Sequence, residues 1–209
     1  MIQIKTMQLG PVMTNAYLVA DEATKEAAVI DPAWDGHLIL AEAETQGWDI
    51  KHIWVTHAHF DHMGGAGAVV DGLEIPPDVA LHPSDRMLWR AKGGAPLFGV
   101  RFESSTKPTM ELSHGQILKL GENTVEVRHA PGHTKGHVMF YFQEARVLFS
   151  GDVIFQGSVG RTDLPGGSWD TLQNSIQTQV LSLPDEVRIL SGHGPETSVG
   201  VERRSNPFL

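Results

Sequence analysis

Short apolar runs, separated by turns rich in glycine, proline and acidic residues, recur along the whole chain and predict β-strands. Val125-Glu126-Val127 shows the clearest alternation, with a charged residue between two apolar ones, as in a half-buried strand. The predicted strands lie at residues 2–8, 15–20, 27–30, 52–55, 79–82, 116–120, 124–130, 137–142, 146–149 and 187–190. The strand at 27–30 ends before Asp31-Pro32, because proline disfavours helix at the residue before it.

Four segments have the composition or spacing of helices, at residues 35–45, 63–70, 83–89 and 169–181. Ser168 is the predicted N-cap of the last one, which ends before Pro184. Residues 92–108 contain several glycines and prolines and are predicted to form a long loop. Both halves have strands followed by a helix, which predicts an α+β protein in which two mixed sheets pack face to face with helices outside. The 209 residues are expected to form a single domain.

Composition narrows the possible partners. The net charge is −9 and no Lys/Arg-rich block occurs, so we expect no nucleic-acid partner. No apolar run approaches the length of a membrane span, and residues 1–7 lack the features of a signal peptide, so we expect a cytoplasmic protein without a membrane partner. The sequence leaves the oligomeric state open.

The chain contains no cysteine, which excludes disulfides, thiolate nucleophiles and cysteine-ligated metals. Any metal must therefore be held by histidine, aspartate or glutamate. These are the nitrogen and oxygen ligands that divalent zinc, iron and manganese accept.

Residues 56–62 read Thr-His-Ala-His-Phe-Asp-His and follow a predicted strand directly. In an extended segment alternate residues project to one side, so His57, His59 and Asp61 are expected to converge while His62 points elsewhere. One metal would leave a ligand unused, so this spacing predicts two metals. The alternative is a solvated histidine-rich loop, which four ligand-type side chains within six positions disfavour.

Later strands end in glycine-flanked loops that each carry one more ligand-type residue. These residues are His133, Asp152 and His193. Strand ends of this kind lie along one rim of a domain, where loops on a rigid scaffold carry function. Five imidazoles and two carboxylates suffice for two metals if one carboxylate bridges them. Water bound to such metals has a pKa of about 7, so no side-chain nucleophile is required.

The ordered set formed by residues 56–62, His133, Ser150-Gly151-Asp152 and Gly192-His193-Gly194 resembles the motifs of the metallo-β-lactamase superfamily. The resemblance implies an αββα sandwich with two divalent metal ions at its edge, zinc being the first expectation and iron or manganese the alternatives. It implies that one metal is bound by His57, His59 and His133 and the other by Asp61, His62 and His193. Asp152 would bridge the metals, and Asp31 would support the ligands from behind.

Residues 157–167 are similar to a segment of glyoxalase II-like hydrolases and of persulfide dioxygenases, and residues 202–208 are similar to the ending of short bacterial glyoxalase II-like proteins. This resemblance implies a thioester hydrolase acting on S-lactoylglutathione or a related acyl-glutathione, with Asp61 orienting the attacking hydroxide. Arg161, inside the first segment, is the candidate contact for the carboxylates of the small-molecule substrate. Only 16 residues follow His193, so the C-terminal helical domain of full-length glyoxalase II is expected to be missing.

Other functions stay open. A persulfide dioxygenase of the same fold would hold a single iron through two histidines and one aspartate. A hydrolase of another small thioester, ester or lactone, or a non-catalytic binding module, would use the same scaffold. The histidines outside the set are expected to be surface or structural residues, with His137 a candidate support for the site; they are His37, His52, His82, His114, His129 and His137.

Overall fold

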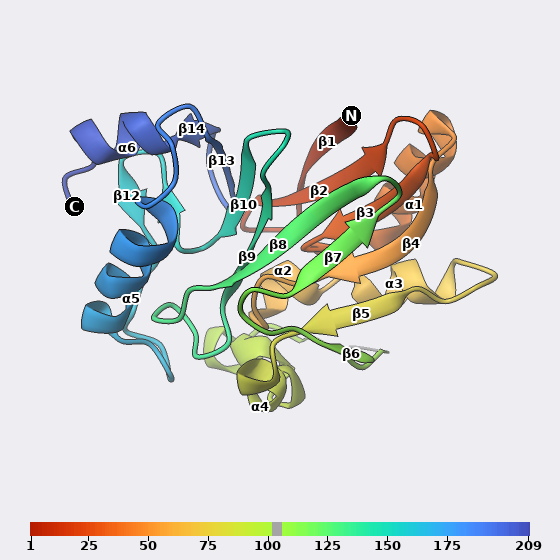
Figure 1. Ribbon diagram of the computed structural model, residues 1–209. Coiled ribbons are helices and arrows are strands. Elements are labelled where there is room, and N and C mark those ends of the chain that lie inside the picture. Colours follow the sequence, from red (N-terminus) through yellow and green to blue (C-terminus); the bar gives the residue numbers. More distant parts are fainter. Residues whose placement is uncertain (102–105) are drawn as a thin grey trace.

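The computed structural model describes residues 1–101 and 106–209, and two six-stranded sheets lie face to face at its centre (Figure 1). The first sheet is antiparallel through its first three strands and parallel thereafter. Its strands, in spatial order, are β1 (Ile2–Leu9), β2 (Thr14–Asp21), β3 (Glu26–Ile30), β4 (Asp49–Trp54), β5 (Asp78–Leu81) and β6 (Met110–Glu111).

The second sheet is antiparallel except where β10 and β13 run parallel. Its strands, in spatial order, are β14 (Thr197–Ser198), β13 (Arg188–Ser191), β10 (Val147–Gly151), β9 (Val138–Phe142), β8 (Asn123–His129) and β7 (Ile117–Leu120). A separate short hairpin pairs β11 (Ile154–Phe155) with β12 (Ser158–Val159).

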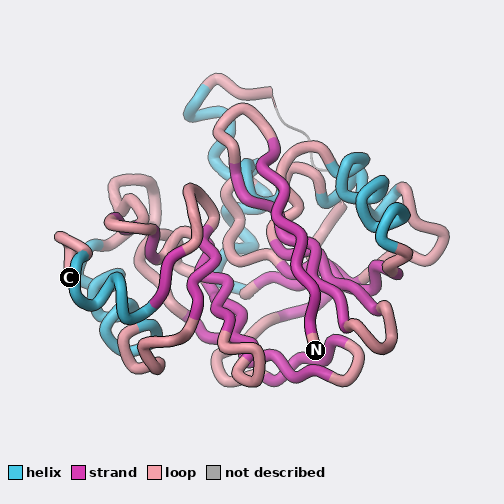
Figure 2. Tube along the Cα trace, turned by 90° about the horizontal axis from the view of Figure 1, so that it is seen from above, coloured by secondary structure: helices cyan, strands magenta, loops and turns pink. Residues whose placement is uncertain are grey.

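Helices flank both sheets, as the tube in Figure 2 shows from above. The first sheet carries α1 (Gly36–Gln46) and α3 (Ala66–Asp71), and the second carries α5 (Trp169–Ser175) with its π-helical continuation Ile176–Val180 and α6 (Val199–Ser205). Shorter turns are α2 (Phe60–Met63), α4 (Arg86–Arg90) and the 3₁₀ segments Pro83–Asp85 and Lys92–Phe98. Within the described ranges, no helix has both the length and the apolar character needed to cross a membrane.

Three apolar cores account for this layering. In β2, Leu18 and Ala20 pack toward α1 and α3, whereas Tyr17 and Val19 pack between the two sheets. Because successive side chains of a strand point to opposite faces, β2 contributes to two different cores and is buried on both faces. The third core lies between the second sheet and α5. The αββα sandwich predicted from the sequence is confirmed.

Several local predictions differ from the structure. The chain is extended only through His59 and then forms α2, so Asp61 lies on a helical turn and does not continue the alternation of His57 and His59. A four-residue helix is too short to produce a periodic signal. The predicted loop at 92–108 contains the 3₁₀ segment Lys92–Phe98, and residues 102–105 lie outside the described ranges. The short strands β6, β11, β12 and β14, together with α6, had not been predicted.

Candidate metal centre

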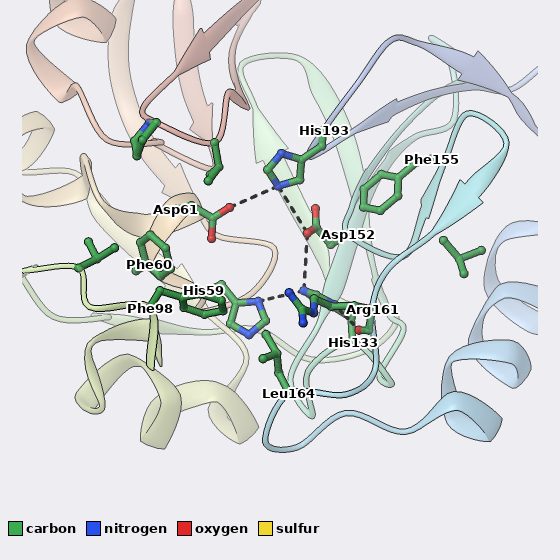
Figure 3. Close-up of a pocket in the computed structure, with 14 residues that line it drawn as sticks. His59, Phe60, Asp61, Phe98, His133, Asp152, Phe155, Arg161, Leu164 and His193 are labelled. Atoms are coloured by element: carbon green, nitrogen blue, oxygen red, sulfur yellow. Dashed lines mark hydrogen bonds and ion pairs between the residues drawn. The ribbon is translucent and has the colours of Figure 1, made fainter. Parts of the chain in front are cut away.

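Each ligand-type residue singled out in the sequence follows the end of a strand. The segment 55–59 follows β4, His133 comes after β8, Asp152 after β10, and His193 after β13. These ends lie at the same edge of the sandwich, so the side chains of both sheets meet there. Figure 3 shows His59, Asp61, His133, Asp152 and His193 pointing toward a common space.

Three imidazoles form a first group of facing nitrogens. Nδ1 of His59 lies 3.0 Å from Nε2 of His57 and 2.9 Å from Nε2 of His133. All three side chains are buried. Their ligand atoms lie within 4.8 Å of one another, which is the spacing of three donors around one cation.

A second group combines one carboxylate with two imidazoles. Oδ2 of Asp61 lies 3.3 Å from Nε2 of His193 and 3.5 Å from Nε2 of His62. Simple alternation predicts that Asp61 converges with His57 and His59. Because Asp61 sits on α2, it faces His193 instead. His62, which that alternation turned away from the site, also contributes to it.

Asp152 lies between the two groups. Its Oδ1 is 3.3 Å from Nε2 of His62, and its Oδ2 is 3.6 Å from Nε2 of both His133 and His193. Among the described residues, His62 Nε2 and Asp152 Oδ1 are buried polar atoms without a hydrogen-bond partner. Buried polar atoms are rarely left unpaired, and these two face each other, so the donor set fits cations held at this position.

Burial keeps the first group in the form that binds metals. Burial and the neighbouring imidazoles lower the pKa of His57 well below its ordinary value and that of His59 to about 3. Both histidines are therefore neutral at pH 7, with lone pairs available for coordination.

The second group has the opposite electrostatics. Burial raises the pKa of Asp61, but the nearby charge of His62 and a hydrogen bond from His193 outweigh it and bring the pKa to about 2. Burial lowers the pKa of His62, but the carboxylates of Asp152, Asp61 and Asp31 raise it well above its ordinary value. The anionic carboxylates give this part of the site a negative potential, which favours the binding of protons or metal ions.

Asp31 holds the ligands from behind. Its carboxylate accepts hydrogen bonds from the backbone N–H and the hydroxyl of Thr56, both at 2.7 Å, and lies 2.8 Å from Nδ1 of His62. This last contact leaves Nε2 of His62 to face the site, as expected of an orienting carboxylate. Asp31 has a φ of 51°, a strained region that aspartate tolerates better than most residues and that these contacts stabilise.

Asp85 was missed in the sequence. Its buried carboxylate accepts hydrogen bonds from the backbone N–H of Ala58 at 3.0 Å, from the hydroxyl of Thr134 at 2.7 Å and from the backbone N–H of Gly136 at 2.7 Å. It thereby joins the loop of His57 and His59 to the loop of His133. Nothing in the sequence around His82-Pro83-Ser84-Asp85 marks this role, because its partners lie far away along the chain.

His137, a candidate support in the sequence, contacts the site from behind. Its ring stacks on His57 with centroids 4.7 Å apart, and its Nε2 accepts a hydrogen bond from the backbone N–H of Asp152 at 3.0 Å. His133 is oriented in a similar way, because its Nδ1 lies 2.7 Å from the carbonyl oxygen of Arg161. Of the other histidines, His52 pairs with Glu26 and His82 stacks on His129.

A cavity of about 540 Å³ opens beside the two groups. Its wall is largely apolar, with Phe60 and Phe98 on one side and Phe155 on another (Figure 3). Arg161 is the one lysine or arginine among the described residues lining it. The guanidinium of Arg161 forms two hydrogen bonds of 2.7 Å with Asp163, so its charge is already paired.

A cluster of seven histidine and aspartate side chains at the edge of an αββα sandwich is the arrangement of a metal-dependent enzyme. The model of the metallo-β-lactamase superfamily matches residues 9–193 of this chain. The chain belongs to this superfamily.

Three similar proteins extend this finding. The hydroxyacylglutathione hydrolase GloC of Haemophilus influenzae is 37% identical, over 100% of this chain and 98% of its own. The crystal structure of the BLEG-1 B3 metallo-β-lactamase is 40% identical, with a TM-score of 0.92 and 99% of both chains covered. The crystal structure of TTHA1623 in a di-iron-bound form is 40% identical, with a TM-score of 0.89, covering 98% of this chain and 100% of that one.

Proposed function

We propose that the protein binds two divalent metal ions and hydrolyses glutathione thioesters of small hydroxy acids, such as S-lactoylglutathione. The observation that carries the proposal is the arrangement of seven ligand atoms in two facing groups with Asp152 between them. The di-iron form of a structure 40% identical to this chain supports the number of metals.

The first metal would be held by His57, His59 and His133, and the second by Asp61, His62 and His193. Asp152 would contact both. Bound there, the two ions supply Lewis-acid polarisation of a carbonyl and a water that ionises near pH 7. Zinc is our first expectation, and an all-nitrogen-and-oxygen site also accepts iron or manganese.

The residues of the chain position the reactants. Asp61 faces the cavity, and its Oδ2 accepts a hydrogen bond from Thr14 at 3.0 Å, which fixes the carboxylate where it can orient the attacking water. The apolar wall limits the water around the thioester. The departing thiolate needs little acid assistance, because the conjugate thiol has a pKa of about 8.5.

The similarity to GloC supports glutathione as the carrier of the acyl group. Glutathione carries two carboxylates, and Arg161 at the cavity wall is our candidate contact for one of them. We propose no macromolecular partner for this activity. The similarity to BLEG-1 makes β-lactam hydrolysis a second activity that the same assay must compare.

The test combines kinetics with an oxygen electrode, using metal-loaded protein. We expect hydrolysis of S-lactoylglutathione without oxygen uptake, and faster turnover of this thioester than of a β-lactam. The Asp61→Asn variant should keep its fold and lose at least about 100-fold in turnover, the range expected for a group that positions a reactant. An exposed aspartate, replaced as Asp49→Asn, serves as the matched control.

Three outcomes would contradict the proposal. Oxygen uptake with glutathione persulfide and one iron per chain would indicate a dioxygenase. Faster turnover of a β-lactam, ester or lactone than of the thioester would show that the substrate assignment is wrong, while the metal-site assignment would remain. Normal turnover in Asp61→Asn would remove Asp61 from the mechanism.

A further inference from the structure

A second pocket, of about 250 Å³, adjoins the main cavity. It lies between residues 88–98 and residues 164–165, and it shares His59, Phe98 and Leu164 with the main cavity. In Figure 3, Phe98 and Leu164 flank His59, whose Nδ1 faces the metal-binding nitrogens. The pocket therefore begins at the ligand cluster and leads away from it.

The side pocket is apolar. Among the described residues that line it, His59 is the only titratable one, and the others include Leu88, Ala91 and Leu97. Its volume exceeds the roughly 150 Å³ of an apolar cavity that binds benzene. A phenyl ring or a branched alkyl group fits such a space, whereas the methyl group of a lactoyl substrate would leave most of it unfilled.

Packing against α2 holds the wall of this pocket in place. Gly93 is buried with a φ of 60°, and a Cβ at this position would overlap the backbone nitrogen of Phe60. The ring of Phe60 contacts Trp34 and Phe98, with centroids 6.1 and 5.9 Å apart. A preformed apolar pocket binds without the free-energy cost of ordering its wall.

A thioester carbonyl has two substituents, the thiol carrier and the acyl side chain, and they point in different directions. A charged tripeptide such as glutathione is poorly suited to the uncharged side pocket and better suited to the main cavity, where Arg161 lies. We propose that the side pocket binds the acyl side chain, and that the substrates are thioesters of 2-hydroxy acids with an aromatic or branched-alkyl substituent. This inference rests on the proposed thioesterase function and names the acyl group.

Two measurements on metal-loaded protein test the pocket. The first compares kcat/KM for S-mandeloylglutathione and S-lactoylglutathione, whose acyl groups differ by phenyl against methyl. The second compares the binding of the free acids mandelate and lactate by calorimetry, which requires no turnover. We expect each ratio to favour the phenyl compound by about tenfold or more, the effect of burying a few additional carbons.

Three variants locate the effect. Ala91→Leu fills the side pocket, and Leu97→Ser removes part of its wall. Because Ala91 is exposed and the side chain of Leu97 is 66% exposed, both variants should fold. Both should reduce the phenyl preference at least threefold. Ala41→Leu, the matched control on the exposed face of α1, should leave it unchanged.

The outcomes separate the two proposals. Equal binding of mandelate and lactate, or a preference that Ala91→Leu and Leu97→Ser leave unchanged, overturns the pocket assignment even if S-lactoylglutathione is hydrolysed. A phenyl preference in binding that both variants reduce supports the pocket. If neither glutathione thioester is then turned over, the carrier assignment fails and the pocket stands.

Discussion

Asp85 has the hydrogen-bonding environment of a carboxylate and of no other side chain. Its Oδ2 accepts from Ala58 and Thr134, and its Oδ1 accepts from Gly136, so three donors converge on it. An amide offers one acceptor oxygen and one donor nitrogen. Asparagine at this position would therefore place its own N–H groups against at least one of the three donors.

We predict that Asp85→Asn weakens metal binding by about 10- to 100-fold, as expected when a group that orients ligands is lost. The unpaired buried donor should also cost about 1–3 kcal/mol of the free energy of unfolding. Competition with a chromogenic chelator and chemical unfolding measure the two effects. Asp49→Asn, which removes an exposed carboxylate paired with Lys51, is the control. Wild-type metal affinity in Asp85→Asn would show that the two loops are held by other contacts.

The buried histidines predict acid sensitivity of the metal-free protein. Burial lowers the pKa of His57, His59 and His137, so below about pH 6.5 the unfolded chain takes up protons that the folded chain does not. His62 and His193, whose pKa values are raised, stay protonated in the folded state, so they oppose the effect near pH 6.5, where the unfolded chain is half protonated at these positions, and no longer do so toward pH 5.

We therefore expect the free energy of unfolding of the metal-free protein to fall as the pH drops from 6.5 to 5, by at most about 4 kcal/mol per pH unit for three protons. Chemical unfolding at several pH values measures the slope. His137→Gln should make it shallower by about one third, because one of the three protons is lost. A flat profile between pH 7 and 5 would contradict neutral buried histidines in the folded state.

At the scale of elements, the segment Lys92–Phe98 is fixed by one close contact with α2. Gly93 and Gly94 both have positive φ, at 60° and 76°. A Cβ on Gly93 would overlap the backbone of Phe60, next to His59, whereas a Cβ on Gly94 would find only Leu97, at 3.9 Å. A side chain at Gly93 or at Gly94 would therefore strain the backbone to a similar extent, but only a side chain at Gly93 would also clash with neighbouring atoms.

Gly94→Ala should cost about 1 kcal/mol of the free energy of unfolding, from backbone strain alone. Gly93→Ala should cost several kcal/mol, because the clash involves backbone that cannot move away, and should also displace His59 and lower metal occupancy. Thermal unfolding and metal content of the purified variants measure both effects. Similar losses in the two variants would show that the contact with α2 is not what holds the segment.

The sequence predicts elements well where their signal is local. The strands at 27–30 and 187–190 lie within a residue of β3 and β13, because apolar runs bounded by turns mark them. The helix α2 and the two-residue strands β6, β11, β12 and β14 are too short to carry a period. The hydrogen bonds of Asp85 span up to 51 positions, so only the folded chain reveals them.

At the scale of the whole molecule, the metal centre joins the two halves of the sandwich. The first sheet positions Asp31 and residues 57–62, and the second positions His133, Asp152 and His193. Ligands so far apart in sequence meet only in the folded protein, so metal binding stabilises the folded state.

Removing the metal with a chelator should therefore lower the thermal midpoint, and adding it back should restore the midpoint. Free metal at 100 times its dissociation constant contributes about 2.7 kcal/mol per site. Differential scanning calorimetry at fixed pH measures the shift. A midpoint that is the same with and without metal would argue against a centre that links the two sheets.

The proposal that two metals share Asp152 is tested most directly by titrating the metal-free protein with zinc and counting the ions bound per chain. We predict two for the wild type and one for His193→Ala, since this partly exposed histidine belongs to the second group alone. One ion per chain in the wild type, or two in His193→Ala, would contradict the dinuclear assignment.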